Sequence, residues 1–104
     1  MITMSVLMLL RVPGNGAQFE KAAASDPARM STIIASARAH GLQSHHFWAD
    51  DKDLLVVDVW PDEASFQAFF SSESDRIGAL MAAAGITTQP EITFYRKLDV
   101  GDDV

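Results

Sequence analysis

The fold of this chain is decided by the stretch Leu54-Leu55-Val56-Val57-Asp58-Val59-Trp60-Pro61-Asp62-Glu63-Ala64-Ser65-Phe66. Its first half is an apolar, β-branched run that is typical of a buried strand; it carries one acid, Asp58, and ends in Trp60. Directly after it comes Asp62, a residue type that caps the N-termini of helices. The stretch therefore predicts a buried strand that leads at once into a helix.

Turn residues and hydrophobic spacing place the other elements. Further strands are predicted at residues 5–12, 42–49 and 92–98. Further helices are predicted as a short turn at residues 19–24, from Pro27 to Gly41, and in a segment capped by Ser72 with Asp75 as its capping-box partner and ending at Gly85. The order strand, helix, strand, strand, helix, strand is the split βαβ arrangement of ferredoxin-like folds. We therefore predict one α+β domain at residues 1–104 with a four-stranded antiparallel sheet.

Composition narrows the possible partners and the compartment. The 104 residues carry a formal net charge of −6 and only eight scattered Lys and Arg residues, so no nucleic-acid partner is expected. The sequence has no cysteine, which excludes disulfides, thiolate chemistry and Cys-ligated metals and fits a reducing cytoplasm. The apolar run at residues 1–10 is shorter than the ~20 residues of a membrane helix and lacks the features of a signal peptide. We expect a cytoplasmic protein without a membrane partner.

The first and third strands are apolar on both faces. Alternate side chains of a strand point to opposite faces. The opposing sets are Val6, Met8 and Leu10 against Leu7 and Leu9, and Leu54, Val56 and Trp60 against Leu55, Val57 and Val59. One layer of helices can bury only one face, and the other would leave a large apolar patch on a monomer. A homodimer whose sheets pack face to face resolves this and closes a barrel-like space between sheet and helices.

A longer piece of the opening stretch carries a family resemblance: Val56-Val57-Asp58-Val59-Trp60-Pro61-Asp62-Glu63-Ala64-Ser65-Phe66-Gln67-Ala68-Phe69. It resembles the strand–Trp–helix signature of the dimeric α+β barrel proteins and, within them, of the antibiotic biosynthesis monooxygenase-like group. The order of elements agrees along the whole chain. Members of the group include cofactor-free oxygenases of aromatic or polyketide-like substrates, haem-degrading enzymes and proteins without an established activity. The resemblance therefore implies the fold and leaves the activity open.

The resemblance also implies roles for particular positions. Trp60 corresponds to a strand-end Trp that lies at the ligand cavity in family members. The haem-degrading branch uses an Asn on the first strand and a His on the helix after that Trp. This chain has no Asn in the first strand, at residues 5–12, and no His after His46. Haem is therefore disfavoured, and we expect no cofactor.

Two adjacent histidines and the strand acid suggest a general base. His45 and His46 lie on the second strand, and histidine has the ordinary pKa nearest to neutrality. If one of them faces Asp58, the carboxylate orients an imidazole that can remove a phenolic or activated carbon proton. By that step a cofactor-free oxygenase makes an electron-rich substrate react with oxygen. Neighbours on one strand point to opposite faces, so the two histidines cannot bind the same ion, and no metal is expected.

The turn between the second and third strands decides which histidine faces the acid. An even-length turn places His45 opposite Asp58, with Trp60 on the same face. A three-residue turn instead pairs His46 with Asp58 and brings Trp48 to that face. We prefer His45 and keep both histidines as catalytic candidates.

Structural roles compete with these functional ones. A His–Asp pair across strands is often a satisfied polar contact, and Trp60 can pack in a core or interface as readily as it lines a cavity. Phe70 and Met81 have the helical spacing of core residues, and either can reach a pocket. Tyr95 can anchor a phenolic or anionic ligand or lie at an interface with its hydroxyl in water. The substrate-binding candidates are Trp48, Trp60, Phe70, Met81 and Tyr95.

Sequence motifs support neither nucleotide-dependent nor hydrolytic chemistry. The chain contains no Gly-x-Gly-x-x-Gly, no Walker-type Gly-Lys-Ser/Thr, no Gly-x-Ser-x-Gly and no His-Glu-x-x-His. The sequence therefore predicts a homodimer that binds a small apolar or aromatic molecule. Two functions remain open. One is a cofactor-independent monooxygenase with a strand histidine as general base, and the other is a non-catalytic small-molecule-binding or structural dimer.

Overall fold

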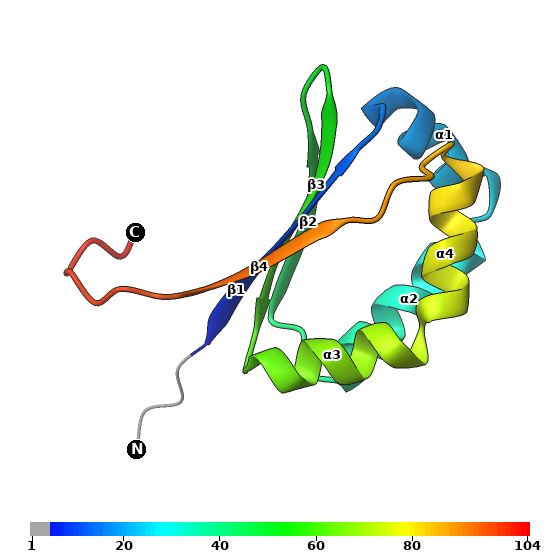
Figure 1. Cartoon of the computed structure of the whole chain (residues 1–104). Coiled ribbons are helices and arrows are strands. Elements are labelled where there is room, and N and C mark those ends of the chain that lie inside the picture. The colour runs from blue at the N-terminus through cyan, green and yellow to red at the C-terminus, as the bar shows by residue number, and fades with distance from the viewer. Residues whose placement is uncertain (1–4) are drawn as a thin grey trace.

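Residues 5–104 form a four-stranded antiparallel sheet with four helices on one of its faces (Figure 1). The computed structural model describes residues 5–104, so the first part of the apolar run at residues 1–10 lies outside it. The elements are β1 (Val6–Pro13), α1 (Gly16–Ser25), α2 (Pro27–Ala39), β2 (Ser44–Ala49), β3 (Asp53–Trp60), α3 (Glu63–Ser72), α4 (Ser74–Ala83) and β4 (Glu91–Arg96). The strand order is β2-β3-β1-β4. The predicted ferredoxin-like α+β fold is confirmed.

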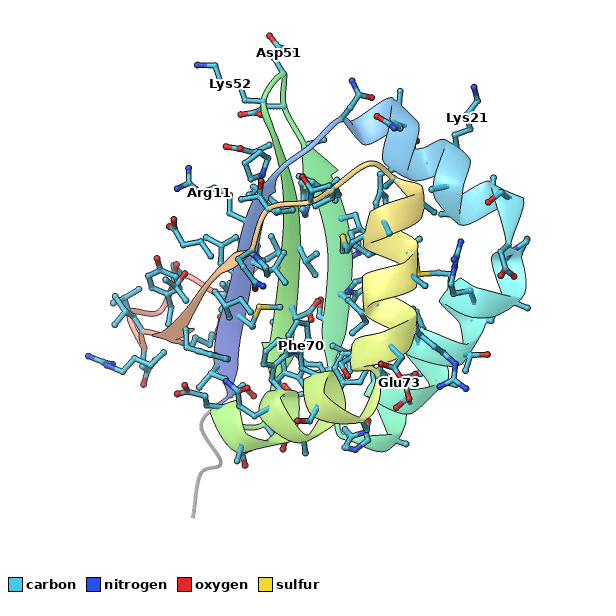
Figure 2. The ribbon with its side chains drawn as sticks, turned by 45° about the vertical axis from the view of Figure 1, so that its right-hand side comes forward. Arg11, Lys21, Asp51, Lys52, Phe70 and Glu73 are labelled. Atoms are coloured by element: carbon cyan, nitrogen blue, oxygen red, sulfur yellow. The ribbon has the colours of Figure 1, made fainter. Side chains whose placement is uncertain are left out.

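A tight turn at residues 50–53 closes the β2–β3 hairpin, whose tip projects beyond the sheet (Figure 2). The backbone N–H of Asp50 donates to the carbonyl of Asp53 at 3.1 Å. The Asp50 carboxylate accepts from the backbone N–H groups of Lys52 and Asp53 at 2.8 and 2.7 Å. Many hairpin turns need a residue with positive φ, but among residues 5–104 only glycines have one, and this turn contains no glycine. The hydrogen bonds to the Asp50 carboxylate stabilise the turn instead. The turn has the even length that we preferred.

Glycines end α2 and α4 in the same way. Gly41 and Gly85, with φ of 104° and 76°, follow the two helices in the left-handed region. After α2, the N–H of Leu42 donates to the carbonyl of Ala37 at 3.0 Å and so completes the helix end. The donor of Leu42 is therefore used by the helix. For this reason β2 begins at Ser44 and not at residue 42 as predicted.

The junction between α3 and α4 corrects a predicted cap. Ser72 is the last residue of α3, and its hydroxyl donates to the carbonyl of Phe69 at 2.9 Å. Glu73 precedes α4 and makes no side-chain cap bond. The predicted capping box of Ser72 and Asp75 is wrong, because a single residue separates the two helices and leaves no room for Ser72 outside α3.

Two other boundaries differ from the sequence prediction. α1 has ten residues instead of a short turn, because the side chain of Asn15 accepts from the backbone N–H of Gln18 at 2.8 Å and caps it. Asn15 lies among turn-forming residues, which concealed its role as a cap. β4 ends at Arg96, which pairs with Val6, the first residue of β1.

The sheet has a covered face and an open face. The covered face packs against the helices in a core that includes Met8, Leu10, Val12, Leu54, Val56 and Trp60 from the strands and Phe66, Phe69 and Leu80 from the helices. The open face carries half-buried Leu7, Leu9, Leu55, Val57 and Val59 and exposed His46, Trp48 and Tyr95. Figure 1 shows all four helices on the covered side. The predicted apolar character of both faces is therefore confirmed for β1 and β3.

Within residues 5–104, no helix combines the length and the apolar character needed to cross a membrane.

The hairpin turn gives a prediction for acid unfolding. The backbone N–H groups of Asp53 and Lys52 lower the pKa of the Asp50 carboxyl in the folded protein. A carboxyl with a lowered folded-state pKa stabilises the fold above its unfolded value of about 3.9, and this contribution is lost as the pH falls through the folded pKa. We expect Asp50→Asn to be less stable than the wild type at neutral pH and to approach it below about pH 4. Urea unfolding followed across this pH range measures the difference.

Asp51→Asn, at the exposed tip of the same turn, is the matched control. It removes one carboxylate and leaves the charged Asp50 acceptor of the Lys52 and Asp53 N–H groups in place. Equal effects of the two substitutions would show that net charge, and not the Asp50 bonds, governs the pH dependence.

Candidate functional site

A buried acid on β3 organises the candidate site. Only 3% of Asp58 is exposed. Nδ1 of His45 lies 2.7 Å from Oδ1 of Asp58, and the indole N–H of Trp60 donates to Oδ2 at 3.1 Å. Each carboxylate oxygen therefore has a hydrogen-bond partner, which a buried carboxylate requires. We call these three residues the Asp58 cluster.

Strand register brings the Asp58 cluster together. His45 lies directly opposite Asp58 in the β2–β3 ladder, and Trp60 lies two residues along β3 on the same face. His46 instead pairs with Val57, whose side chain is on the open face. The structure therefore has the preferred pairing, and the alternative pairing of His46 with Asp58 is wrong.

The Asp58 carboxylate also fixes the proton arrangement that we assign to His45. An ionised carboxylate can only accept hydrogen bonds, so Nδ1 of a neutral His45 carries its hydrogen toward Asp58. Nε2 is then unprotonated and free to take a proton. The imidazole packs edge-on against the ring of Phe47, with a centroid distance of 4.6 Å and an interplanar angle of 90°. Two neighbours thus restrict the orientation of this base.

His45 and Asp58 line a cavity between the sheet and the helices. Among the described residues that line it, these two are the only polar ones; the others are apolar side chains of β1, β2, β3, α2, α3 and α4 and of Leu42. Phe70 and Met81, two substrate-binding candidates, are part of this wall. The cavity therefore presents one oriented polar pair in an otherwise apolar enclosure. We call it the inner cavity.

The inner cavity is small, with a volume of about 60 Å³. Small-molecule pockets commonly measure ~300–1,000 Å³. A ring-sized ligand can enter only if lining side chains move. Met30 and Met81 are suited to such movement, because methionine has three flexible bonds and adapts to irregular spaces.

Trp60 takes a different place from the one that the resemblance implied. It is 0% exposed and packs against the rings of Phe66 and Phe69, with centroid distances of 5.7 and 5.4 Å. It is absent from the lining of the inner cavity, as far as the described residues define it. Its polar contact is the hydrogen bond to Asp58, which the sequence analysis missed. An acid and a Trp two positions apart on one strand face were the available signal.

Three other candidates lie away from the inner cavity. His46, Trp48 and Tyr95 are on the open face, where Trp48 and Tyr95 are 59% and 54% exposed. His40 is the C-cap of α2, and its Nδ1 lies 2.8 Å from the carbonyl of Ser36. Within residues 5–104, no group of three or more His, Asp or Glu side chains is placed to hold a metal ion.

Comparison with solved structures supports the fold along nearly the whole chain. SnoaB from Streptomyces nogalater, a cofactor-independent oxygenase, is 16% identical with a TM-score of 0.63, and the match covers 98% of this chain and 100% of that one. The monooxygenase from the gene ActVA-Orf6 of Streptomyces coelicolor, in complex with Nanaomycin D, is 15% identical with a TM-score of 0.67 and coverages of 94% and 91%. NE2512 from Nitrosomonas europaea, of unknown function, is 20% identical with a TM-score of 0.59 and coverages of 98% and 97%.

No protein-family model and no curated protein matches the chain. The solved structures nevertheless agree with the fold that the resemblance implies: the chain has the same fold as SnoaB and the ActVA-Orf6 monooxygenase. At identities of 20% or less, this likeness concerns the fold alone.

The Asp58 cluster gives a prediction for stability. Trp60→Phe keeps an aromatic ring beside Phe66 and Phe69 but removes the donor to Asp58 Oδ2. We expect a loss of about 1–3 kcal/mol in the free energy of unfolding from the unpaired carboxylate oxygen, in addition to lost packing. Urea unfolding measures this loss.

A double-mutant cycle with Asp58→Asn separates the hydrogen bond from the packing. We expect the two substitutions to be coupled by about 0.5–3 kcal/mol, as for residues in one hydrogen-bond network. Strictly additive effects would show that the Trp60–Asp58 bond contributes nothing to stability.

Proposed function

We propose that this protein is a cofactor-independent monooxygenase of neutral, electron-rich hydroxyaromatic molecules, with His45 as its general base. The observation that carries the proposal is the single oriented His–Asp pair within an otherwise apolar cavity. An apolar wall suits an aromatic ring, and one base placed in it can remove a proton from that ring system. The shared fold of a cofactor-independent oxygenase supports this proposal.

In the proposed reaction, Nε2 of His45 takes a proton from a phenolic hydroxyl or an activated carbon of the substrate. The resulting imidazolium is paired with the Asp58 carboxylate at 2.7 Å, and the Trp60 donor holds the second carboxylate oxygen in place. Charge that forms on His45 is thus balanced inside an apolar region where it would otherwise be costly. His45 and Asp58 are the proposed catalytic pair, and Trp60 is a positioning residue.

The deprotonated substrate is electron-rich enough to reduce oxygen directly. For an anthrone-type substrate, the ring CH₂ becomes a carbonyl that keeps one atom of O₂, and the other atom leaves as water with the two hydrogens of the CH₂. The substrate is the only reductant and O₂ the only oxidant. The chain's residues therefore need to supply only binding and the transfer of protons.

A second groove offers His45 a route for protons to solvent. His45 is partly exposed and lines both the inner cavity and an outer groove of about 200 Å³, together with Arg38, Gln43 and Ser44. The proton that Nε2 takes from the substrate can later leave to water that reaches the imidazole through this groove, while Nδ1 stays bonded to Asp58. This arrangement supports repeated turnover by a single histidine.

We also propose a homodimer formed by the open face. Its central residues Leu9 and Val57 are partners in the β1–β3 ladder and are apolar, as are Leu7, Leu55 and Val59. A patch of this kind is covered by a partner in most soluble proteins. His46, Trp48 and Tyr95 then lie at the interface, where aromatic residues are common. The composition without cysteine supports a cytoplasmic location.

The two histidines provide a matched test of the catalytic role. We expect His45→Ala to lower the turnover of 1,8-dihydroxyanthrone about 100- to 10,000-fold, the usual contribution of a general base. His46→Ala, one residue along on the open face, should keep the wild-type rate. Oxygen consumption, corrected for spontaneous oxidation of the anthrone, measures both.

Retained turnover in His45→Ala would show that another group is the base. If the wild type is stabilised against heat by the anthrone without air but consumes no oxygen above the spontaneous rate, the protein is a non-catalytic binding protein.

The dimer has a test of its own. We expect the wild type to sediment as a dimer at low micromolar concentration, and Val57→Lys to sediment as a monomer because a buried, unpaired charge opposes the interface. Ala79→Lys, at an exposed position of α4, is the control and should remain dimeric. A wild-type monomer under these conditions would contradict the proposal.

A further inference from the structure

A larger groove adjoins the inner cavity on the side of α4 and β4. It has a volume of about 380 Å³ and lies between α4 and the segment that returns from α4 to β4 (Figure 1). Leu10, Phe70, Ile77 and Met81 line both this groove and the inner cavity, so the two spaces share a wall. Figure 2 shows Phe70 between the sheet and the bend from α3 to α4. We call this space the α4–β4 groove.

The α4–β4 groove is lined by a glycine that the fold does not require. Gly78 lies inside α4, where a glycine costs about 0.5–1 kcal/mol relative to alanine. It is not among the glycines with a positive φ, so its backbone conformation suits any residue. A Cβ atom at this position would meet nothing within 4 Å. Neither the backbone nor the packing of the chain requires a glycine here, and the missing side chain leaves this wall of the groove clear.

The chemistry of the groove differs from that of the inner cavity. Ser74, Thr87, Thr88 and Gln89 contribute hydroxyl and amide groups, and the described residues that line the groove include no charged side chain. Such groups bind neutral hydroxyls and carbonyls and offer no counter-charge to a phosphate or carboxylate. The net charge of −6 likewise disfavours an anionic ligand.

We propose that the α4–β4 groove is the entrance and the outer half of the ligand site, and that a large side chain at residue 78 would close it. The occupant is an uncharged, elongated aromatic molecule whose hydroxyl or carbonyl end lies in the groove while its reacting ring displaces Phe70 and Met81 and approaches His45. This inference rests on the proposed function, since it takes an aromatic ring as the occupant of the inner cavity. The groove also explains how a ligand can bind although the inner cavity is small, because the groove by itself has the volume of a small-molecule pocket.

A graded series at Gly78 tests the proposal. We expect Gly78→Ala to raise the melting temperature, because alanine favours the helix, and to change binding little. Gly78→Leu and Gly78→Phe should weaken binding of 1,8-dihydroxyanthrone progressively, by about tenfold or more for Phe, and lower kcat/KM in parallel. Calorimetric titration without oxygen measures binding apart from turnover. Ala79→Phe, exposed on α4 and not part of the groove, is the matched control and should bind as the wild type does.

The outcomes separate this inference from the proposed function. Wild-type affinity and kcat/KM in Gly78→Phe would overturn the groove as entrance and leave the role of His45 standing. Binding that weakens along the series, in a protein that consumes no oxygen, would support the groove and overturn the oxygenase. A wild type that does not bind the anthrone would overturn both. Thermal melting identifies a variant that fails to fold, and Gly78→Leu then decides in place of Gly78→Phe.

Discussion

The hydrogen bonding of one buried carboxylate constrains the centre of this structure. Asp58 lies on the covered face of β3, where an unpaired charge would be strongly unfavourable. His45 and Trp60 satisfy its two oxygens. Trp60 lies on the same strand as Asp58, whereas His45 is in reach only because β2 and β3 pair in this register. A slip of a single residue would replace His45 by His46 on that face and turn the base away from the interior. The Asp50 turn that sets the register is therefore a remote determinant of the candidate site.

The alternation of side chains along the strands gives the two faces of the sheet separate roles. On the covered face, helices and strands bury Asp58 and most of His45, which strengthens the electrostatic interaction between them. On the open face, the central side chains of β1 and β3 are apolar and lie next to exposed aromatic residues of the edge strands, and Arg11 and Asp53 form an ion pair at one end. The histidine that contacts Asp58 and the histidine on the open face thus follow each other in the sequence. Their opposite orientation follows from the period of the strand and needs no other cause.

Much of this arrangement could be predicted from the sequence, because it depends on local period and turn length. The faces of β1 and β3, the cap at Asp62 and the pairing of His45 with Asp58 all belong to this class. The contact of Trp60 with Asp58 depends on how the indole packs against α3, and Ser72 failed as a cap because local residues do not show where the preceding helix ends. The size of the inner cavity depends on the tertiary packing of six elements. Gly78 gives no sequence signal beyond weak helix propensity, and its meaning emerges only when the space around it is known.

The small inner cavity and the unexplained glycine point to the same region of the molecule. A chain selected for stability alone would place alanine at residue 78 and rigid side chains in the core, since both changes favour a single packed state. This chain has instead a helix-weakening glycine in the α4–β4 groove and three methionines around the inner cavity. Gly78 and Met81 both line the groove that adjoins this cavity. Weak helix propensity and flexible side chains thus lie on the proposed path of the ligand, whereas rigid aromatic packing around Trp60 holds the donor to the Asp58 carboxylate in place.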